Sequence, residues 1–117
     1  MSVSVQLLDC VHGSPAAGVA VRLERDAGDG WCTVRTGGTN SAGRCELTDE
    51  DVPGPRRIEV ATDGYFVALG LRPYYRGIVV ALPRAEAADL ELSLSVSPFA
   101  YTVTLTRVPA WSAAAGR

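Results

Sequence analysis

Lysine is absent from the sequence, and histidine occurs once, as His12. All eleven basic residues are therefore arginines. The lack of lysine excludes Schiff-base chemistry and any catalytic lysine. Arginine stays protonated, so it can bind an anion but is a poor general base. Together with the many alanines, glycines and valines, this bias indicates a high-GC bacterial genome.

Cysteine is also scarce, and the three cysteines form neither a CxxC pair nor a spacing typical of zinc ligands. We expect no metal and no cofactor. The N-terminus (MSVSVQLLDC) lacks the basic start and apolar stretch of a signal peptide, and no apolar run approaches the length of a membrane span. These features predict a cytoplasmic protein. Cys10, Cys32 and Cys45 are interpreted as buried or half-buried small apolar residues.

A strong charge of either sign is missing too, since the net charge is −2. This balance gives no electrostatic reason to expect nucleic acid or a membrane surface as partner. A chain of 117 residues, 47% of them apolar, is typical of one globular domain. We assign residues 1–110 to this domain and residues 111–117 (WSAAAGR) to a flexible tail.

Strand-like segments dominate the sequence, with turn signals between them at short intervals. Several of them alternate apolar and polar residues, as strands do when one face is buried. Asp63 to Leu71 (DGYFVALGL) is the best candidate for a helix, although it is short and contains two glycines. About eight strands and one short helix predict an all-β fold, a two-sheet β-sandwich. The expected strands are 2–8, 19–24, 31–36, 44–47, 57–62, 77–82, 90–96 and 100–108.

The last two expected strands form a hairpin with two different faces, joined by a tight turn at Ser97 and Pro98. One face is apolar and is expected to pack in the core. A polar outer face is normal in sandwiches, but serine and threonine are unusual choices for simple exposure to solvent. Such a face is suited to lining a cavity or a subunit interface. Its residues are Glu91, Ser93, Ser95, Thr102, Thr104 and Thr106.

Three segments resemble the transthyretin and 5-hydroxyisourate hydrolase family. Residues 8–23 (LDCVHGSPAAGVAVRL) resemble the transthyretin opening, where LD, GSPA and VAV recur at the same spacing. Residues 39–44 (TNSAGR) resemble the hydrolase signature TNxDGR, and residues 97–102 (SPFAYT) resemble the SPxxYS/T hairpin of both branches. Tyr65 falls at the family's YF element, and Tyr74–Tyr75 at its FYP element, which gives these tyrosines a structural role.

The resemblance covers roughly residues 3–107 with few gaps and implies an assembly as well as a fold. Family members are two-sheet sandwiches that pair into dimers, and two dimers associate face to face into a homotetramer. A channel crosses the centre of the tetramer and is lined by the last two strands. The polar face of the hairpin, together with Leu8, would then form the channel wall and contact a small-molecule substrate or ligand.

Only one of four elements of the hydrolase chemistry carries over to this sequence. The family's first histidine falls on Gln6, and the histidine of its HYH segment falls on Glu91. The signature arginine is retained as Arg44, but the C-terminal YRGS motif is replaced by TLTR at residues 104–107. General acid–base groups typically supply about 10²–10⁴-fold each. Standard 5-hydroxyisourate hydrolysis is therefore not expected.

The residues at these positions still suggest a catalytic site. The Gln6 amide donates and accepts hydrogen bonds but does not titrate. Arg44 presents a planar fork for a carboxylate, enolate or oxyanion, and Glu91 is the candidate acid–base group. Each has an ordinary alternative: Gln6 facing solvent, Arg44 in a structural salt bridge, and Glu91 paired with Arg44 across the channel mouth. His12 is interpreted as a surface turn residue.

Three functions remain open on the sequence. The favoured one is a divergent enzyme of bacterial specialised metabolism that acts on a small cyclic metabolite by proton transfer with ring opening, hydrolysis or cyclisation. In it Glu91 is the base and Arg44 steadies an enolate or alkoxide. The second is a small-molecule binding protein like transthyretin, and the third is a degenerate structural subunit.

Overall fold

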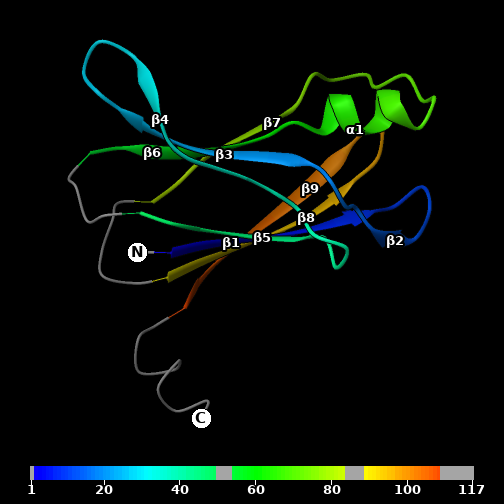
Figure 1. Ribbon diagram of the computed structural model, residues 1–117, viewed down its shortest axis with the longest axis horizontal. Coiled ribbons are helices and arrows are strands. Elements are labelled where there is room, and N and C mark those ends of the chain that lie inside the picture. Colours follow the sequence, from blue (N-terminus) through cyan, green and yellow to red (C-terminus); the bar gives the residue numbers. More distant parts are fainter. Residues whose placement is uncertain (1, 50–53, 84–88, 109–117) are drawn as a thin grey trace.

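The computed structural model describes residues 2–49, 54–83 and 89–108. Two β-sheets pack against each other in this part of the chain, with a short helix at one end (Figure 1). In the first sheet the strand order is β2–β1–β8–β9, with β5 also paired to β1, and in the second it is β4–β3–β6–β7. The elements are β1 (Ser2–Asp9), β2 (Ser14–Pro15), β3 (Ala20–Asp26), β4 (Trp31–Gly38), β5 (Arg44–Thr48), β6 (Arg56–Val60), α1 (Thr62–Ala68), β7 (Ile78–Ala81), β8 (Asp89–Val96) and β9 (Tyr101–Val108).

The core lies between the two sheets and is built from the apolar residues that alternate along the strands. On β1, Val3, Val5 and Leu7 have no exposed surface, whereas Ser4 and Gln6 between them are partly exposed. Successive side chains of a strand point to opposite faces, so the apolar set enters the core and the polar set faces outward. Burying each valine or leucine contributes about 1.5–3 kcal/mol. Other buried residues from both sheets are Val21, Leu23, Ile58, Val60, Ile78, Leu90, Leu92, Leu94 and Val96.

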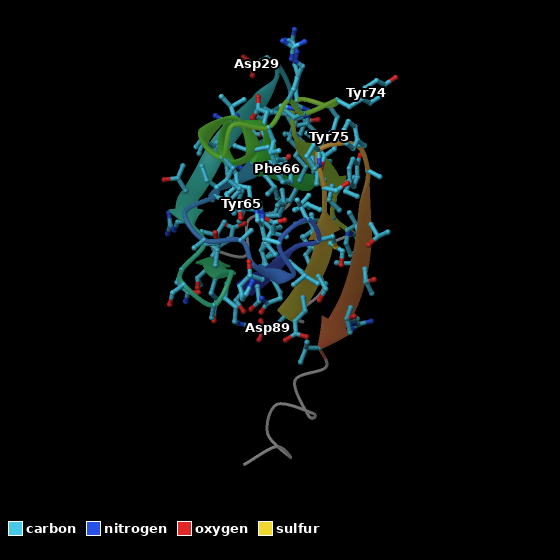
Figure 2. All side chains as sticks on the ribbon, turned by 90° about the vertical axis from the view of Figure 1, so that its right-hand side faces the viewer. Asp29, Tyr65, Phe66, Tyr74, Tyr75 and Asp89 are labelled. Atoms are coloured by element: carbon cyan, nitrogen blue, oxygen red, sulfur yellow. The ribbon has the colours of Figure 1, made fainter. Side chains whose placement is uncertain are left out.

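Helix α1 closes one end of the core through Phe66, which is fully buried. Figure 2 shows Phe66 inside the molecule, with the Tyr65 ring beside it. The two ring centroids are 5.3 Å apart and the ring planes meet at 70°, an edge-to-face contact. The helix ends at Ala68, earlier than the predicted Leu71, because Gly70 adopts a φ of +77° that ends helical geometry.

The pairing of β1 decides which outward-facing residues become neighbours. β1 runs parallel to β8, with Gln6 opposite Ser93, and antiparallel to β5, with Gln6 opposite Arg44. Parallel strands need a long connection between them. The neighbours of β1 therefore come from distant parts of the sequence, and the outer face of the first sheet collects side chains from β5, β1, β8 and β9.

The structure confirms the all-β, two-sheet fold with one short helix. It adds one strand, since Ser14 and Pro15, which lie outside the predicted strands, pair with the end of β1. The tail and the end of the predicted domain lie outside the described residues, so the 1–110 boundary stays a prediction. Among the described residues, no helix has the length and apolar character to cross a membrane.

Candidate functional site

The outer face of the first sheet, turned away from the core, carries all the residues predicted for the site. The backbone register arranges them in three rows that run across the strands. Because side chains in one row stand about 5 Å apart, they can contact a common ligand. The Gln6 row contains Arg44, Gln6, Ser93 and Thr104; the Glu91 row contains Glu46, Ser4, Glu91 and Thr106; the Leu8 row contains Leu8, Ser95 and Thr102.

The loop between β4 and β5 sets the position of Arg44 at the start of β5. Thr39 is buried, and its hydroxyl donates a hydrogen bond to the Ala16 carbonyl at 2.6 Å. The Asn40 side-chain oxygen accepts from the backbone N–H groups of Ala42 and Arg44, each at 3.0 Å. Such side-chain to backbone bonds stabilise a tight turn. The first two residues of the TNSAGR segment thus build the loop that presents Arg44.

Gly43 lets Gln6 approach this loop closely. Its φ of +74° lies in the left-handed region, and a Cβ there would stand 2.5 Å from the Leu7 carbonyl oxygen and 3.2 Å from Gln6 Nε2. With no side chain in the way, Gln6 Nε2 donates to the Ala42 carbonyl at 2.8 Å. Gln6 Oε1 accepts from Arg44 Nη1 at 3.1 Å. The Gln6 amide is therefore held at both ends.

The structure brings Gln6 and Arg44 into contact but sets Glu91 one row away. Glu91 lies two residues along β8 from Ser93, the partner of Gln6, which is about 7 Å along the strand. Its carboxylate is exposed and makes no ion pair with Arg44 within the chain. Arg44 is exposed too, and the Nη1 bond to Gln6 uses one of its five N–H donors. The remaining donors can bind an anion or an oxyanion.

The other predicted residues share this face with several residues that were not predicted. Leu8 is 41% exposed, an apolar spot among hydroxyl groups. The residues of this face that were not among the predicted site residues include Ser2, Ser4, Glu46, Thr48 and Asp89. The signal for Glu46 was the alternation along β5, where the buried Cys45 precedes it, but nothing local shows that β5 pairs with β1.

A buried carboxylate at the end of β1 forms a second polar centre. Asp9 has no exposed surface and accepts hydrogen bonds from the Tyr65 hydroxyl at 2.7 Å and the Val11 N–H at 2.8 Å. His12 Nδ1 lies 2.8 Å from the same carboxylate, so this half-exposed ring also anchors the turn. Burial raises the pKa of Asp9, but the hydrogen bonds from Tyr65, His12 and Val11 outweigh it, and the net pKa is lowered. Burial and the Asp9 contact raise the pKa of Tyr65 to about 12.

Two interpretations of single residues are wrong. Cys10 is exposed, because it follows the last residue of β1 and lines an open pocket of about 190 Å³ with Ser95 and Thr102 of the Leu8 row. Tyr74 is 85% exposed and its side chain points away from the molecule, so the side chain does not pack against the rest of the described chain (Figure 2). Cys32 and Cys45 are half-buried and buried as predicted. Within residues 2–49, 54–83 and 89–108, no group of three or more His, Cys, Asp or Glu is placed to hold a metal.

Comparison with known proteins assigns the chain to a family. The model of the HIUase/transthyretin family matches residues 3–104. The chain belongs to the HIUase/transthyretin family. Transthyretin from Sparus aurata is 31% identical with a TM-score of 0.83, and the match covers 92% of this chain and 97% of that one. Sea bream transthyretin in complex with thyroxine is 31% identical with a TM-score of 0.82, covering 92% and 96%.

The range matched by the family model contains most of the candidate site. The matched range includes β1, the loop that presents Arg44, β8 and the first half of β9. Gln6 and Glu91 therefore stand within the matched region, at the positions where the resemblance places the histidines of the hydrolase branch. The chain has the fold of this family, with Gln6, Arg44 and Glu91 on the outer face of its first sheet.

Proposed function

We propose that this chain is a divergent enzyme of the HIUase/transthyretin family that binds a small cyclic metabolite on the outer face of its first sheet. The reaction is proton transfer with ring opening, hydrolysis or cyclisation, and it needs no cofactor. The observation that carries the proposal is the Gln6–Arg44 pair, joined at 3.1 Å and supported by the loop that Asn40 and Gly43 shape. A sheet face that only meets solvent needs no such support.

Each polar group has a chemical role in this reaction. The free N–H donors of Arg44 bind a substrate oxygen and stabilise the negative charge that develops on it as an enolate or alkoxide forms. Glu91 accepts the proton that leaves the substrate and returns a proton to the product. Gln6 orients a carbonyl or a lactam edge. Hydroxyl groups of the Ser and Thr residues on the face bind the ring substituents.

The spacing of these groups suits a small ring. Arg44 and Glu91 stand on strands that have β1 between them and lie one row apart, so their backbones are separated by about 10 Å across the sheet and about 7 Å along it, about 12 Å in all. Both side chains are long and exposed, and a five- or six-membered ring lying over Gln6 and Ser4 can contact both. Leu8 offers an apolar contact at the next row.

A second copy of the chain completes the site in this proposal. β9 is an edge strand of the first sheet, so one side of its backbone has no strand partner in the described part of the chain. Its Tyr101 and Leu105 are 45% and 39% exposed although both are large and largely apolar. Association into dimers and then face to face into a homotetramer would cover this edge and enclose the outer face in a channel. Sedimentation equilibrium measures the mass directly.

The setting of the protein is part of the same proposal. We place it in the cytoplasm, where the exposed Cys10 thiol would stay reduced. Because the positions of the hydrolase histidines carry Gln6 and Glu91, we place the reaction in bacterial specialised metabolism instead of purine breakdown.

Turnover of cyclic substrates by the wild type and by Glu91→Gln tests the proposal. A panel of small lactams and cyclic ureides that includes 5-hydroxyisourate is followed by ultraviolet absorbance. We expect the wild type not to accelerate the hydrolysis of 5-hydroxyisourate. With the ring that the wild type does convert, we expect Glu91→Gln to lower kcat by about 10²-fold or more while binding is retained. Asp29→Asn removes a carboxylate from an exposed turn of the other sheet and serves as the matched control (Figure 2). Full activity in Glu91→Gln would show that another group is the base.

The second candidate function is binding without turnover. It is favoured by the structural match to a transthyretin that was solved in complex with thyroxine. Titration followed by recovery of unchanged ligand identifies this function. In that case Arg44→Met weakens binding, and neither the wild type nor Glu91→Gln converts the ligand.

A further inference from the structure

Glu46 occupies a position on the outer face that mirrors Glu91. It pairs with Ser4 from the β5 side, and Glu91 pairs with Ser4 from the β8 side. The two backbones are therefore about 10 Å apart, with the small Ser4 side chain between them. Both glutamates are exposed and extend from the same face, so the space above Ser4 is bordered by two carboxylates.

These two carboxylates leave the outer face with an uneven charge. Arg44 is the one cation among the residues of the three rows, and its contact is with the neutral Gln6 amide instead of a carboxylate. Neither Glu46 nor Glu91 forms an ion pair with a described residue. In a channel formed by two such faces the excess negative charge would be doubled, and exclusion of water would strengthen its effect.

The charges are also separated by row. The Gln6 row offers N–H donors from Arg44, whereas the neighbouring Glu91 row offers carboxylate acceptors. A ligand that fits both rows carries an oxygen acceptor at one end and N–H donors or a positive charge at the other. An anionic group at the second end would lie against two carboxylates and would be repelled.

We infer that Glu46 is a specificity-determining residue of this site and that, with Glu91, it selects rings bearing amidine-type N–H donors or a positive charge over anionic rings. The inference rests on the proposed function, because it assigns a ligand class to the same face. This selectivity distinguishes the site from one that binds carboxylated ligands, which Arg44 alone would favour. Glu46 acts through direct contact with the ligand and has no part in proton transfer.

Three five-membered rings of different charge test the inference: 2-aminoimidazolium as cation, hydantoin as neutral ring and hydantoin-5-acetate as anion. Their affinities for the full-length protein are measured by NMR titration. We expect the cation to bind at least about tenfold more tightly than the anion, and Glu46→Gln to reduce that ratio by about tenfold while hydantoin affinity changes little. Asp29→Asn, which removes a carboxylate outside the face, is expected to leave the ratio unchanged.

The outcomes distinguish this inference from the proposed function. Binding that Arg44→Met abolishes, but that shows no preference for the cation or no response to Glu46→Gln, overturns the role of Glu46 and leaves the proposed site standing. If none of the three rings binds the wild type saturably, both the ligand class and the proposed ring-binding site are overturned. A preference for hydantoin-5-acetate contradicts the charge argument directly.

Discussion

Replacing Tyr65 by phenylalanine is expected to destabilise the fold through the buried Asp9 carboxylate. The Tyr65 hydroxyl donates to Asp9 at 2.7 Å, and Asp9 has no exposed surface on which water could replace the lost donor. Phenylalanine keeps the ring and its edge-to-face contact with Phe66. The substitution therefore removes one hydrogen bond to a buried charge and little else.

The size of the effect follows from what Asp9 retains. A hydrogen bond to a charged group contributes about 1.5–3 kcal/mol. Asp9 keeps the N–H donors of Val11 and His12 and the contact with the His12 ring, so we expect a loss of about 2 kcal/mol. With an unfolding entropy of about 2.1 cal/mol/K per residue, this loss lowers Tm by about 8 °C.

Urea denaturation and thermal melting at pH 7 measure the difference. Tyr74→Phe is the matched control, because the Tyr74 side chain is 85% exposed, and its stability is expected to change by less than about 0.5 kcal/mol. Below the pKa of Asp9 the two proteins should converge, since a protonated carboxyl accepts the Tyr65 bond less strongly. Equal stability of Tyr65→Phe and wild type at pH 7 would refute the role assigned to this bond.

Two further predictions concern pH and the loop beside Arg44. The folded-state pKa of Asp9 is lowered and that of Tyr65 is raised to about 12. The Asp9 contribution is thus complete above about pH 4 and lost as pH falls through the folded pKa, while the Tyr65 contribution is complete below about pH 10 and lost as pH rises toward 12. Melting curves recorded below pH 4 and above pH 10 measure both contributions. A wild-type Tm that does not fall as the pH drops below about 4 would contradict the role of Asp9. Gly43→Ala forces a Cβ into a left-handed position 2.5 Å from a carbonyl oxygen. We expect its free energy of unfolding, measured in urea, to fall by at least about 1–3 kcal/mol and its ligand binding to weaken. Gly28→Ala, in open space at an exposed turn, should leave ligand binding unchanged.

Local sequence patterns were sufficient to predict the strands and many of the residues on the outer face. Strict alternation in β8 and β9 separates apolar from hydroxyl residues, because side chains of a strand point to opposite faces whatever the strand pairs with. The LD, TNSAGR and SPFAYT segments indicated the family, and the resemblance named Gln6, Arg44 and Glu91 as a candidate site. These inferences needed no knowledge of which strands are neighbours.

Neighbour relations across the sheet came only from the tertiary fold. Gln6 meets Arg44, and Ser4 is bordered by Glu46 and Glu91, because β1 pairs with β5 on one side and β8 on the other. Such non-local register is set by the packing of the whole core, and no short segment records it.

Burial at the chain's turns also depended on the complete fold. Asp9 lies at an inward-facing position of β1, but its buried carboxylate is satisfied by the Tyr65 hydroxyl of α1, 56 residues further along the chain, while the next residue, Cys10, is exposed. The alternation along β1 predicts which face each strand residue occupies, but it makes no prediction beyond the last residue of the strand. There the helix and loops packed nearby determine which side chains are exposed to water.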